Sequence, residues 1–571
     1  MNKEAIIKFK DFSFKYFSQA YPTLKNLNLE IFPGEKVLII GPSGSGKSTI
    51  GNCLNGLIPF SYRGEISGSL QINNIETKES NIFELSKTIG TVLQDTDGQF
   101  VGLSVAEDIA FSMENDCVSL GEMKERVQKV AKMIDIDNIL NLSPHELSGG
   151  QKQRTALAGI MVDNVDILLF DEPLANLDPA TGKYAIEIID NIHKETNKTI
   201  IIIEHRIEDV LYKDIDRIIL IDNGEIVADL PVHEMIASNL FIKHGIREPL
   251  YVTLLRYAGV KITSSMKPGY INTIDISTAK EKVLTWYTDN QRAIPEITGN
   301  SILRAEHVTF SYNSKKQILT DISFDIKEGE MISIVGRNGA GKSTLSKLIC
   351  GFEKNHEGKI FFKGEDIANK TITERATLIG YVMQNPNQMI TTSLIYDEIA
   401  LGLKMRNIDS ETIDLKVNEM LKVCGLTKFK TWPIAALSYG QRKRVTIASI
   451  LVLDPKIIIL DEPTAGQDYA HFTEIMEFLK DINKHLGITI IMITHDMHLM
   501  LEYTHRSIVL NESDLVADTA SSDVLTNPRI IEKANLKETS LFHLANMLGI
   551  KPAKSLVDTF ITYETEVMRN E

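Results

Sequence analysis

Two stretches decide the fold of this chain, and they read Gly41-Pro42-Ser43-Gly44-Ser45-Gly46-Lys47-Ser48 and Gly336-Arg337-Asn338-Gly339-Ala340-Gly341-Lys342-Ser343. Both fit G-x-x-x-x-G-K-[ST], a glycine-rich loop whose backbone N–H groups face phosphate. An unbroken apolar run, Val37–Ile40 or Ile332–Val335, leads into each loop, as expected for a strand buried on both faces of a parallel sheet. One match alone is compatible with a turn that binds nothing. Two matches, each after a buried strand, indicate two phosphate sites.

The landmarks that follow each loop also occur twice. They are Gln94 and Gln384, the Leu-Ser-x-Gly-Gln stretches 147–151 and 437–441, the Asp-Glu-Pro stretches 171–173 and 461–463, and His205 and His495. The two loop lysines lie 295 residues apart, whereas every landmark from the glutamine onward lies 290 residues from its counterpart. One five-residue length difference between loop and glutamine explains the change. The chain is therefore a tandem duplication.

Composition indicates a globular protein with more than one core. The chain has 571 residues, which suits two domains of roughly 240 residues with connecting segments. The net charge of −15 disfavours non-specific binding to nucleic acid, and we expect no nucleic-acid partner. The start of the chain has no signal-like stretch and no window approaches 18 uninterrupted apolar residues, so a membrane role would require partner subunits. Four cysteines without C-x-x-C spacing favour reduced thiols over a disulfide or a metal site.

The apolar pattern predicts an α/β fold in each half. Val165–Phe170 and Thr199–Ile203, with their counterparts Ile457–Leu460 and Thr489–Ile493, have the composition of buried parallel strands. The stretches between the glutamine and Leu-Ser-x-Gly-Gln have a helical pattern, which predicts a helical subdomain. We expect a first nucleotide-binding domain over 1–237, a connector forming a small folded insert over 238–300, a second domain over 301–525 and a tail over 526–571 whose role the sequence does not indicate.

The duplicated residues predict nucleotide and metal chemistry. Lys47 and Lys342 are suited to the β and γ phosphates of a nucleotide, and Ser48 and Ser343 to Mg²⁺. Asp171 and Asp461 follow buried strands, where ligand sites of open α/β sheets lie, and are further candidate metal ligands. Glu172 and Glu462 come next and are candidate general bases for the attacking water.

This set of motifs resembles the ATP-binding domains of ABC ATPases over most of the chain. Leu147-Ser148-Gly149-Gly150-Gln151 is similar to the ABC signature, which other phosphate-loop ATPases lack. The resemblance implies two tandem domains, each with a RecA-like parallel-sheet core, an antiparallel β subdomain and a helical signature subdomain. It also implies that the two domains pair within the chain and enclose two ATP molecules head to tail.

The resemblance assigns roles to individual residues. Gln94 and Gln384 match the glutamine that touches Mg²⁺, His205 and His495 the switch histidine that contacts the γ-phosphate, and Tyr16 and Tyr312 the aromatic that stacks on adenine. With Glu172 and Glu462, the histidines form the expected catalytic set. The expected ATP-binding residues are Tyr16, Gly41, Pro42, Ser43, Gly44, Ser45, Gly46, Lys47, Ser48, Thr49, Gln94, Ser148, Gly149, Gly150, Gln151, Tyr312, Gly336, Arg337, Asn338, Gly339, Ala340, Gly341, Lys342, Ser343, Thr344, Gln384, Ser438, Tyr439, Gly440 and Gln441. The expected Mg²⁺ ligands are Ser48, Gln94, Asp171, Ser343, Gln384 and Asp461.

The two halves differ in the signature. The second reads Leu437-Ser438-Tyr439-Gly440-Gln441, with tyrosine in place of Gly149. Both halves keep glutamate, glutamine and histidine, so we expect two sites that bind and hydrolyse ATP. One degenerate site is the alternative.

Three uses of a paired ATPase compete. A genome-maintenance ATPase is disfavoured because the sequence has no room for the long coiled coil that splits each domain in that class. A soluble ABC-type translation factor acting on the ribosome remains the alternative, but the connector lacks the long charged helical pair typical of that class. The segments after Gln94 and Gln384 resemble those of energy-coupling factor ATPases, which import vitamins and transition-metal ions.

The resemblance therefore implies the energising subunit of an importer for a vitamin-like micronutrient or metal ion. Its expected partners are a transmembrane scaffold subunit and a substrate-binding membrane subunit. Its expected place is the cytoplasmic face of the cell membrane, as a peripheral protein.

Overall fold

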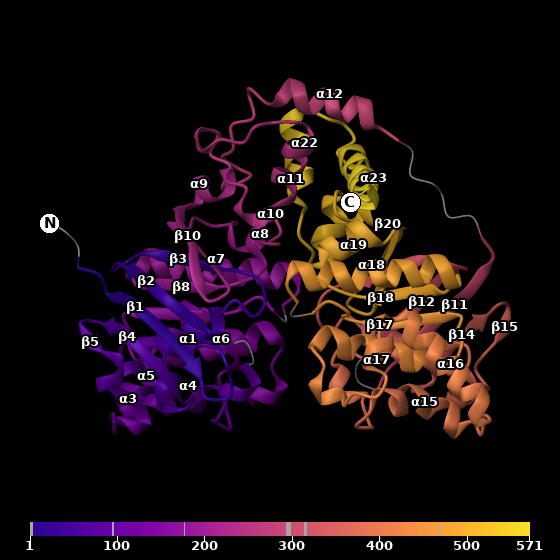
Figure 1. Ribbon diagram of the computed structural model, residues 1–571, viewed down its shortest axis with the longest axis horizontal. Helices are drawn as coiled ribbons and strands as arrows, with labels where there is room; N and C mark the ends of the chain where they lie inside the picture. The colour runs from indigo at the N-terminus through magenta and orange to yellow at the C-terminus, as the bar shows by residue number, and fades with distance from the viewer. Residues whose placement is uncertain are drawn as a thin grey trace. The chain divides into compact units, whose positions relative to one another are not determined.

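The computed structural model describes residues 4–93, 96–175, 177–292, 299–312, 317–465 and 467–570. The chain forms two compact units, the first built mainly of residues up to Trp286 and the second mainly of residues from Tyr287 onward. In Figure 1 the first unit runs from indigo to magenta, and the second ends in orange and yellow.

The first unit contains two sheets. An antiparallel sheet has the strand order β2-β1-β4-β5, and a six-stranded sheet has the order β10-β9-β3-β8-β7-β6. In the larger sheet, β10 is antiparallel to its neighbour and the other pairs are parallel. The bounds are β1 Ile7–Tyr16, β2 Leu24–Ile31, β3 Lys36–Ile40, β4 Gly64–Ile72, β5 Ile75–Glu76, β6 Ile89–Val92, β7 Ile167–Asp171, β8 Thr199–Ile203, β9 Arg217–Asp222 and β10 Glu225–Pro231.

Helices follow β3, β5, β6, β7, β8 and β10 along the chain (Figure 1). They are α1 Lys47–Leu54, α2 Leu57–Phe60, α3 Ile82–Ser86, α4 Val105–Asn115, α5 Leu120–Met133, α6 Gly149–Met161, α7 Pro179–Thr196, α8 Ile207–Val210, α9 Val232–Ala237, α10 Leu240–Lys243 and α11 Leu250–Tyr257, followed by α12 Lys280–Asn290 at the boundary between the units. Helices α4, α5 and α6 form the helical subdomain that the sequence predicts.

The second unit repeats this architecture. Its sheets have the orders β12-β11-β14-β15 and β16-β17-β18-β13-β19-β20. The strands are β11 Ser301–Phe310, β12 Leu319–Lys327, β13 Met331–Val335, β14 Glu357–Phe362, β15 Glu365–Asp366, β16 Ile379–Val382, β17 Ile457–Asp461, β18 Thr489–Ile493, β19 Arg506–Asn511 and β20 Asp514–Ala520. The helices are α13 Lys342–Cys350, α14 Ile372–Arg375, α15 Ile395–Met405, α16 Ser410–Val423, α17 Tyr439–Leu451, α18 Tyr469–Leu486, α19 Met497–Tyr503, α20 Ser521–Val524, α21 Pro528–Ala534, α22 Ser540–Leu548 and α23 Lys554–Asn570.

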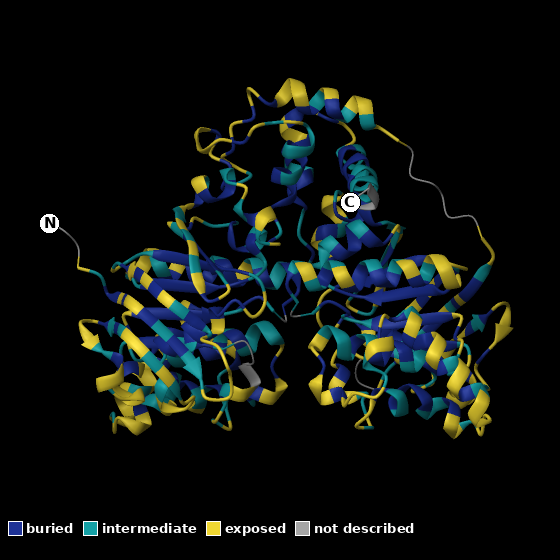
Figure 2. Ribbon diagram, in the orientation of Figure 1, coloured by how far each residue is buried: buried dark blue, intermediate teal, exposed yellow. Residues whose placement is uncertain are grey.

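The core strands are β-branched runs with both faces covered. β8 reads Thr-Ile-Ile-Ile-Ile and β18 reads Thr-Ile-Ile-Met-Ile, and every residue of both strands is buried. Figure 2 shows these central strands in the colour of buried residues. Such strands require layers on both sides, which the helices and the antiparallel sheet supply. The predicted α/β fold with two tandem domains is confirmed.

The duplication extends beyond the motifs that reveal it in the sequence. Helix α11 of the connector and helix α22 of the tail bury leucines at positions 290 apart, Leu254 and Leu544, which are both fully buried. Each helix is followed by a glycine with a positive φ, Gly259 at 67° and Gly549 at 79°. The tail, to which the sequence assigned no role, therefore has a structural counterpart in the connector.

All four cysteines are free. Cys53, Cys350 and Cys424 are buried, and burial raises the pKa of Cys350 and of Cys424 to about 12 and that of Cys53 further. Cys117 is exposed in the turn between α4 and α5.

One buried ion pair distinguishes the first core from the second. Lys36 on β3 donates to Asp190 on α7 at 2.5 Å, and these residues are 4% and 1% exposed. Met331 occupies the place of Lys36 in the second unit, because both pair with the same position of the neighbouring strand. Burial alone would raise the pKa of Asp190, but hydrogen bonds from Lys194 and Lys36 outweigh it and lower the pKa.

We expect Asp190→Ala to lower the free energy of unfolding by about 3 kcal/mol, because it leaves the Lys36 ammonium buried without its carboxylate. Chemical denaturation at neutral pH measures the loss. The contribution of Asp190 to the free energy of unfolding should be lost as the pH falls from 3.8, the ordinary pKa of aspartate, through the lowered pKa of Asp190 in the folded protein. The reason is that the ion pair with Lys36 requires an ionised carboxylate. The control Lys36→Met with Asp190→Leu should stay within about 1 kcal/mol of wild type. Equal stability of Asp190→Ala and wild type would contradict the prediction.

Candidate functional site

Each phosphate loop lies between a buried strand and a helix. Ile40 ends β3, and α1 begins at Lys47; in the second unit Val335 ends β13 and α13 begins at Lys342. The predicted loop residues from Gly41 to Thr49 and from Gly336 to Thr344 form these loops and the first turns of the helices. The first position of each loop requires glycine because a neighbouring carbonyl oxygen lies close to its Cα. A Cβ on Gly41 would lie 2.1 Å from the Ile221 carbonyl oxygen, and a Cβ on Gly336 would lie 2.0 Å from the Leu510 carbonyl oxygen.

The loop lysines are buried and fold back on their own loops. Lys47 Nζ donates to the carbonyl oxygens of Gly41 at 2.8 Å and Pro42 at 2.9 Å. Lys342 Nζ donates to those of Gly336 at 2.8 Å and Arg337 at 3.0 Å. Burial lowers the pKa of Lys47, and the nearby Glu172 carboxylate opposes that shift. An anion in the loop would give this ammonium stronger, charge-assisted partners than carbonyl oxygens.

The aspartates at the ends of β7 and β17 have different neighbours. Burial raises the pKa of Asp171 to about 6, and its Oδ1 is buried without a hydrogen bond from any residue that the structure describes. Asp461 Oδ2 instead accepts a hydrogen bond from Tyr381 at 2.7 Å. The position equivalent to Tyr381 is Thr91, because each pairs with the third residue of the neighbouring strand.

The glutamate and histidine predicted to be catalytic form a close pair in each half. His205 Nε2 lies 2.9 Å from Glu172 Oε1, and His495 Nδ1 lies 2.7 Å from Glu462 Oε1. These four side chains are 12 to 17% exposed, so the pairs are nearly buried. A carboxylate and an imidazole at this separation are able to exchange a proton or to orient a common ligand.

The glutamates adopt a backbone conformation that is uncommon for residues other than glycine. Glu172 has φ 51° and Glu462 has φ 45°. The N–H of Glu172 donates to the Ile203 carbonyl oxygen at 2.9 Å, and the N–H of Glu462 donates to that of Ile493 at 2.9 Å. This hydrogen bond to the neighbouring strand holds each glutamate in the left-handed region, at a cost of roughly 1 kcal/mol.

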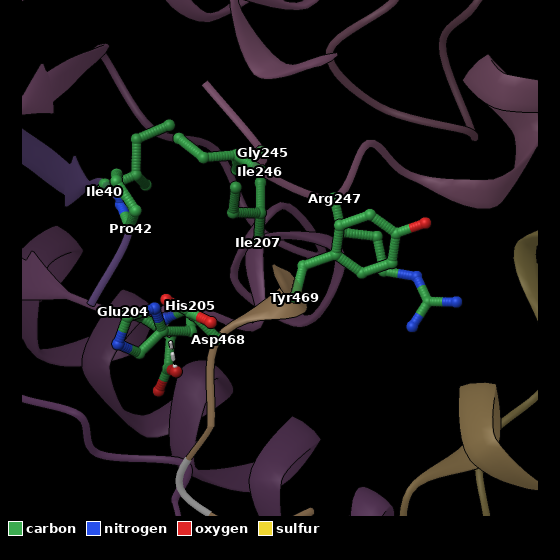
Figure 3. Close-up of a pocket in the computed structure, with 11 residues that line it drawn as sticks. Ile40, Pro42, Glu204, His205, Ile207, Gly245, Ile246, Arg247, Asp468 and Tyr469 are labelled. Carbon is green, nitrogen blue, oxygen red and sulfur yellow. Dashed lines mark hydrogen bonds between the residues drawn. The ribbon is translucent and has the colours of Figure 1, made fainter. Parts of the chain in front are cut away.

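A further carboxylate, that of Glu204, accepts hydrogen bonds from backbone amides around the Glu172–His205 pair. Glu204, 2% exposed, accepts hydrogen bonds from the amides of His205 at 2.7 Å, Arg206 at 3.1 Å and Leu174 at 3.0 Å. Figure 3 shows Glu204 and His205 together near Ile40 and Pro42. Burial raises the pKa of Glu204, and Arg206 opposes that shift. The Glu204 carboxylate thus joins the loop that carries His205 to the segment after Glu172.

The second half has Thr494 at the position of Glu204. Its hydroxyl accepts a hydrogen bond from the Asp496 amide at 2.9 Å, within its own loop. Asp496 then accepts from the amides of His498 and Leu499 and caps α19. The two histidine loops are therefore stabilised by different side chains.

The signature serines begin the signature helices. Ser148 precedes α6, and its N–H donates to Gln151 Oε1 at 2.9 Å. Ser438 precedes α17, its N–H donates to Gln441 Oε1 at 3.0 Å, and its Oγ accepts from the Gln441 amide at 3.3 Å. Gly149, Gly150, Tyr439 and Gly440 lie in the first turns. N–H groups in these turns are suited to an anion.

Two further side chains of α17 contact the segment around Gln384. Tyr439 OH donates to the Gln384 carbonyl oxygen at 3.2 Å. Lys443 Nζ donates to the carbonyl oxygens of Met383 at 2.9 Å and Gln384 at 2.8 Å. Burial lowers the pKa of Lys443 to about 8, and Asp461 and Glu462 oppose that shift.

The predicted adenine-stacking tyrosines lie at the ends of β1 and close after β11. Tyr16 OH is 3.3 Å from Thr49 Oγ1, and Tyr312 OH is 3.5 Å from Thr344 Oγ1. Tyr312 is 53% exposed. The predicted residue Gln94 lies outside the described residues.

The oxygen donors near the phosphate loops suit a hard divalent cation. Asp171 Oδ1 is buried and lacks a hydrogen bond among the described residues, as a metal ligand would, and it lies in the same half as the hydroxyl of Ser48. Ser343 and Asp461 are the equivalent donors in the second half. Carboxylate and hydroxyl oxygens are the ligands that Mg²⁺ prefers, so the donor set fits the predicted metal.

Sequence reasoning missed Glu204, Tyr381 and Lys443. Comparison of the two halves carries a signal for each, because their counterparts Thr494, Thr91 and Gln153 differ in charge or size. Among the described residues, no helix is long and apolar enough to cross a bilayer.

We expect Glu204→Thr, which installs the residue of the second half, to lower the free energy of unfolding by about 2 kcal/mol. The reason is that the buried N–H group of Leu174 and the partly buried N–H group of His205 lose their acceptor. Thermal and chemical unfolding measure the loss. The matched control Thr494→Ser keeps a hydroxyl and should change stability by less than about 1 kcal/mol. A Glu204→Thr variant as stable as wild type would show that this carboxylate is dispensable.

Two family models match this chain. The model described as ABC transporter matches residues 24–175 and 319–465, and the model described as ATP-binding cassette cobalt transporter matches residues 238–310. The second match covers the connector and the first strand of the second unit.

Relatives match nearly the whole length. An ABC transporter ATP-binding protein of Clostridium perfringens is 57% identical over 564 residues, covering 99% of both chains. One of Photobacterium profundum is 53% identical over 560 residues, covering 98% of this chain and 99% of the relative. The solved structure of cbiO1 from Clostridium perfringens, described as part of the ABC transporter complex cbiONQ, is 35% identical and covers 43% of this chain and 99% of that chain, with a TM-score of 0.39. The two full-length relatives do not support the translation-factor alternative.

Proposed function

Because this chain belongs to the ATP-binding proteins of ABC transporters and is an ATPase, we propose that it energises a membrane importer of the energy-coupling factor type. The observation that carries the proposal is the match of residues 238–310 to the family described as ATP-binding cassette cobalt transporter. The cargo would be a vitamin-like micronutrient or a metal ion. The partners would be a transmembrane scaffold subunit and a substrate-binding membrane subunit, with this chain at the cytoplasmic face.

The proposed catalytic cycle uses the same groups in both halves. Each ATP would be bound by one phosphate loop and by the signature of the other half, in a head-to-tail pair. The loop lysine would exchange its carbonyl partners for phosphate oxygens, because a charge-assisted hydrogen bond to an anion is stronger than one to a carbonyl. Bound Mg²⁺, held by Ser48 and Asp171 or by Ser343 and Asp461 with the glutamines Gln94 and Gln384, would neutralise phosphate charge.

The glutamate would act on the attacking water. Glu172 or Glu462 accepts a proton from the water while the water oxygen forms a bond to the γ-phosphorus. The bond between the γ-phosphorus and the β,γ-bridging oxygen breaks, which releases ADP and phosphate. His205 or His495, which lies within 3 Å of that carboxylate, would orient it and donate to the γ-phosphate. The near burial of each pair supports this role, since carboxylate and imidazole interact more strongly away from bulk water.

The catalytic assignment predicts the effect of removing the bases. Glu172→Gln and Glu462→Gln should each lower ATP turnover, and the double variant should lower it by about 100-fold or more, the usual contribution of a general base. Affinity for a fluorescent ATP analogue should stay within threefold of wild type, since the amide has the same shape. Steady-state phosphate release and equilibrium titration measure the two quantities. Glu125→Gln, an exposed position on α5, is the control, and normal turnover in the double variant would refute the assignment.

The importer assignment predicts specific membrane partners. A tagged chain extracted from native membranes with a gentle detergent should retain one scaffold protein with several spans and a small membrane protein. Reconstituting these three chains in vesicles should couple ATP hydrolysis to uptake of the cargo that the small protein binds. The catalytically impaired double variant should assemble equally well and support no uptake. Recovery of ribosomal proteins without membrane subunits would overturn the importer in favour of the translation factor.

A further inference from the structure

Four hydrogen bonds join the beginning of α17 to the segment around Gln384 in the second unit. Lys443 Nζ donates to the carbonyl oxygens of Met383 at 2.9 Å and Gln384 at 2.8 Å. Tyr439 OH donates to the same Gln384 oxygen at 3.2 Å, and Arg442 Nη1 donates to Asn387 Oδ1 at 3.3 Å. The signature helix and the glutamine segment are therefore bonded directly within one unit.

The first unit has different residues at the two main positions. Gly149 stands at the place of Tyr439 and has no side chain to donate a hydrogen bond. Gln153 stands at the place of Lys443, and its Nε2 donates to the carbonyl oxygen of Pro173, directly after the catalytic glutamate. The same helix position thus contacts the Asp-Glu-Pro segment in one half and the glutamine segment in the other.

In the second unit, the hydrogen bonds from Lys443 and Tyr439 hold the Gln384 segment strongly to the signature helix. Lys443 is 1% exposed, so its ammonium has exchanged water for the two carbonyl oxygens. Hydrogen bonds from a charged donor are about twice as strong as neutral ones, and breaking them here would leave a buried charge without partners. The Gln384 carbonyl oxygen accepts two of the bonds, from Lys443 and Tyr439, so its peptide group is the point at which the helix holds the segment.

We propose that Lys443 and Tyr439 are positioning residues for ATP hydrolysis in the second half, which fix the Gln384 segment to the signature helix so that the two shift together. The tyrosine of the second signature then positions the Gln384 segment of its own half, through the hydrogen bond from its hydroxyl. The inference rests on the ATPase activity of the family and does not require the importer assignment.

The test uses the full chain carrying Glu172→Gln, so that the remaining turnover reports the second half. In this background Lys443→Met, which keeps the length of the side chain and removes its donors, should lower kcat at least fivefold and change KM for ATP less than twofold. Lys443→Arg restores donors and should recover at least half of the turnover. Hydrogen exchange of a peptide covering 379–392 should accelerate in Lys443→Met and remain near the wild-type rate in Lys443→Arg.

Lys428→Met removes an exposed lysine of the same subdomain and serves as the matched control. Unchanged kcat and unchanged exchange in a folded Lys443→Met variant would overturn the proposal. If that variant melts below the assay temperature, Tyr439→Phe replaces it in the test, because this substitution removes only one hydroxyl. Faster hydrogen exchange across 379–392 in Tyr439→Phe would support the link, and an unchanged exchange rate would overturn it.

These outcomes are separable from failure of the earlier assignments. The measurements use the isolated chain, so they do not depend on whether membrane partners exist. Full turnover in the double glutamate variant would instead refute the catalytic role of Glu172 and Glu462, and hydrogen exchange would still report whether Lys443 holds the glutamine segment.

Discussion

Hydrogen bonds between the carboxyl ends of neighbouring parallel strands fix the positions of the proposed catalytic groups in both halves. β7 pairs with β8, and β8 pairs with β3, so the chain segments that leave these three strands emerge at one edge of the sheet. The phosphate loop leaves β3, Glu172 follows β7 and His205 follows β8. The bond from the Glu172 amide to the Ile203 carbonyl oxygen continues the ladder one residue past the strand. It brings acid and imidazole together although they are far apart in the sequence, and β17 and β18 do the same for Glu462 and His495.

Much of this arrangement follows from the sequence because it rests on strong local patterns. Runs of isoleucine are typical of strands in the middle of a sheet, and Thr199–Ile203 begins and ends in the structure where the pattern predicts. The correspondence between connector and tail could not be predicted from the sequence. It rests on a few buried apolar positions such as Leu254 and Leu544, and not on a motif that recurs in both segments. The direction of the Tyr439 hydroxyl was beyond prediction as well, since it depends on a long-range contact with Gln384.

The duplicated halves share the groups that we propose to take part in hydrolysis, and they differ in the residues around those groups. Thr91 and Tyr381 stand near the two aspartates, Glu204 and Thr494 precede the two histidines, and Gln153 and Lys443 follow the two signatures. Each difference alters hydrogen bonding or charge within a buried region, where electrostatic interactions are stronger than in water. One ancestral site has thus become two environments with the same expected reaction, and different rates at the two sites would have a structural origin.

The distribution of thiols has a practical consequence for following the motions of this ATPase. Burial and a raised pKa make the Cys53, Cys350 and Cys424 thiols poor nucleophiles, because the thiolate is the reactive form. Cys117 is exposed at the turn that links two helices of the first helical subdomain. The unaltered chain therefore has a natural attachment point for one fluorophore or spin label, on one half only. A probe placed there would report on the first helical subdomain without any engineered cysteine.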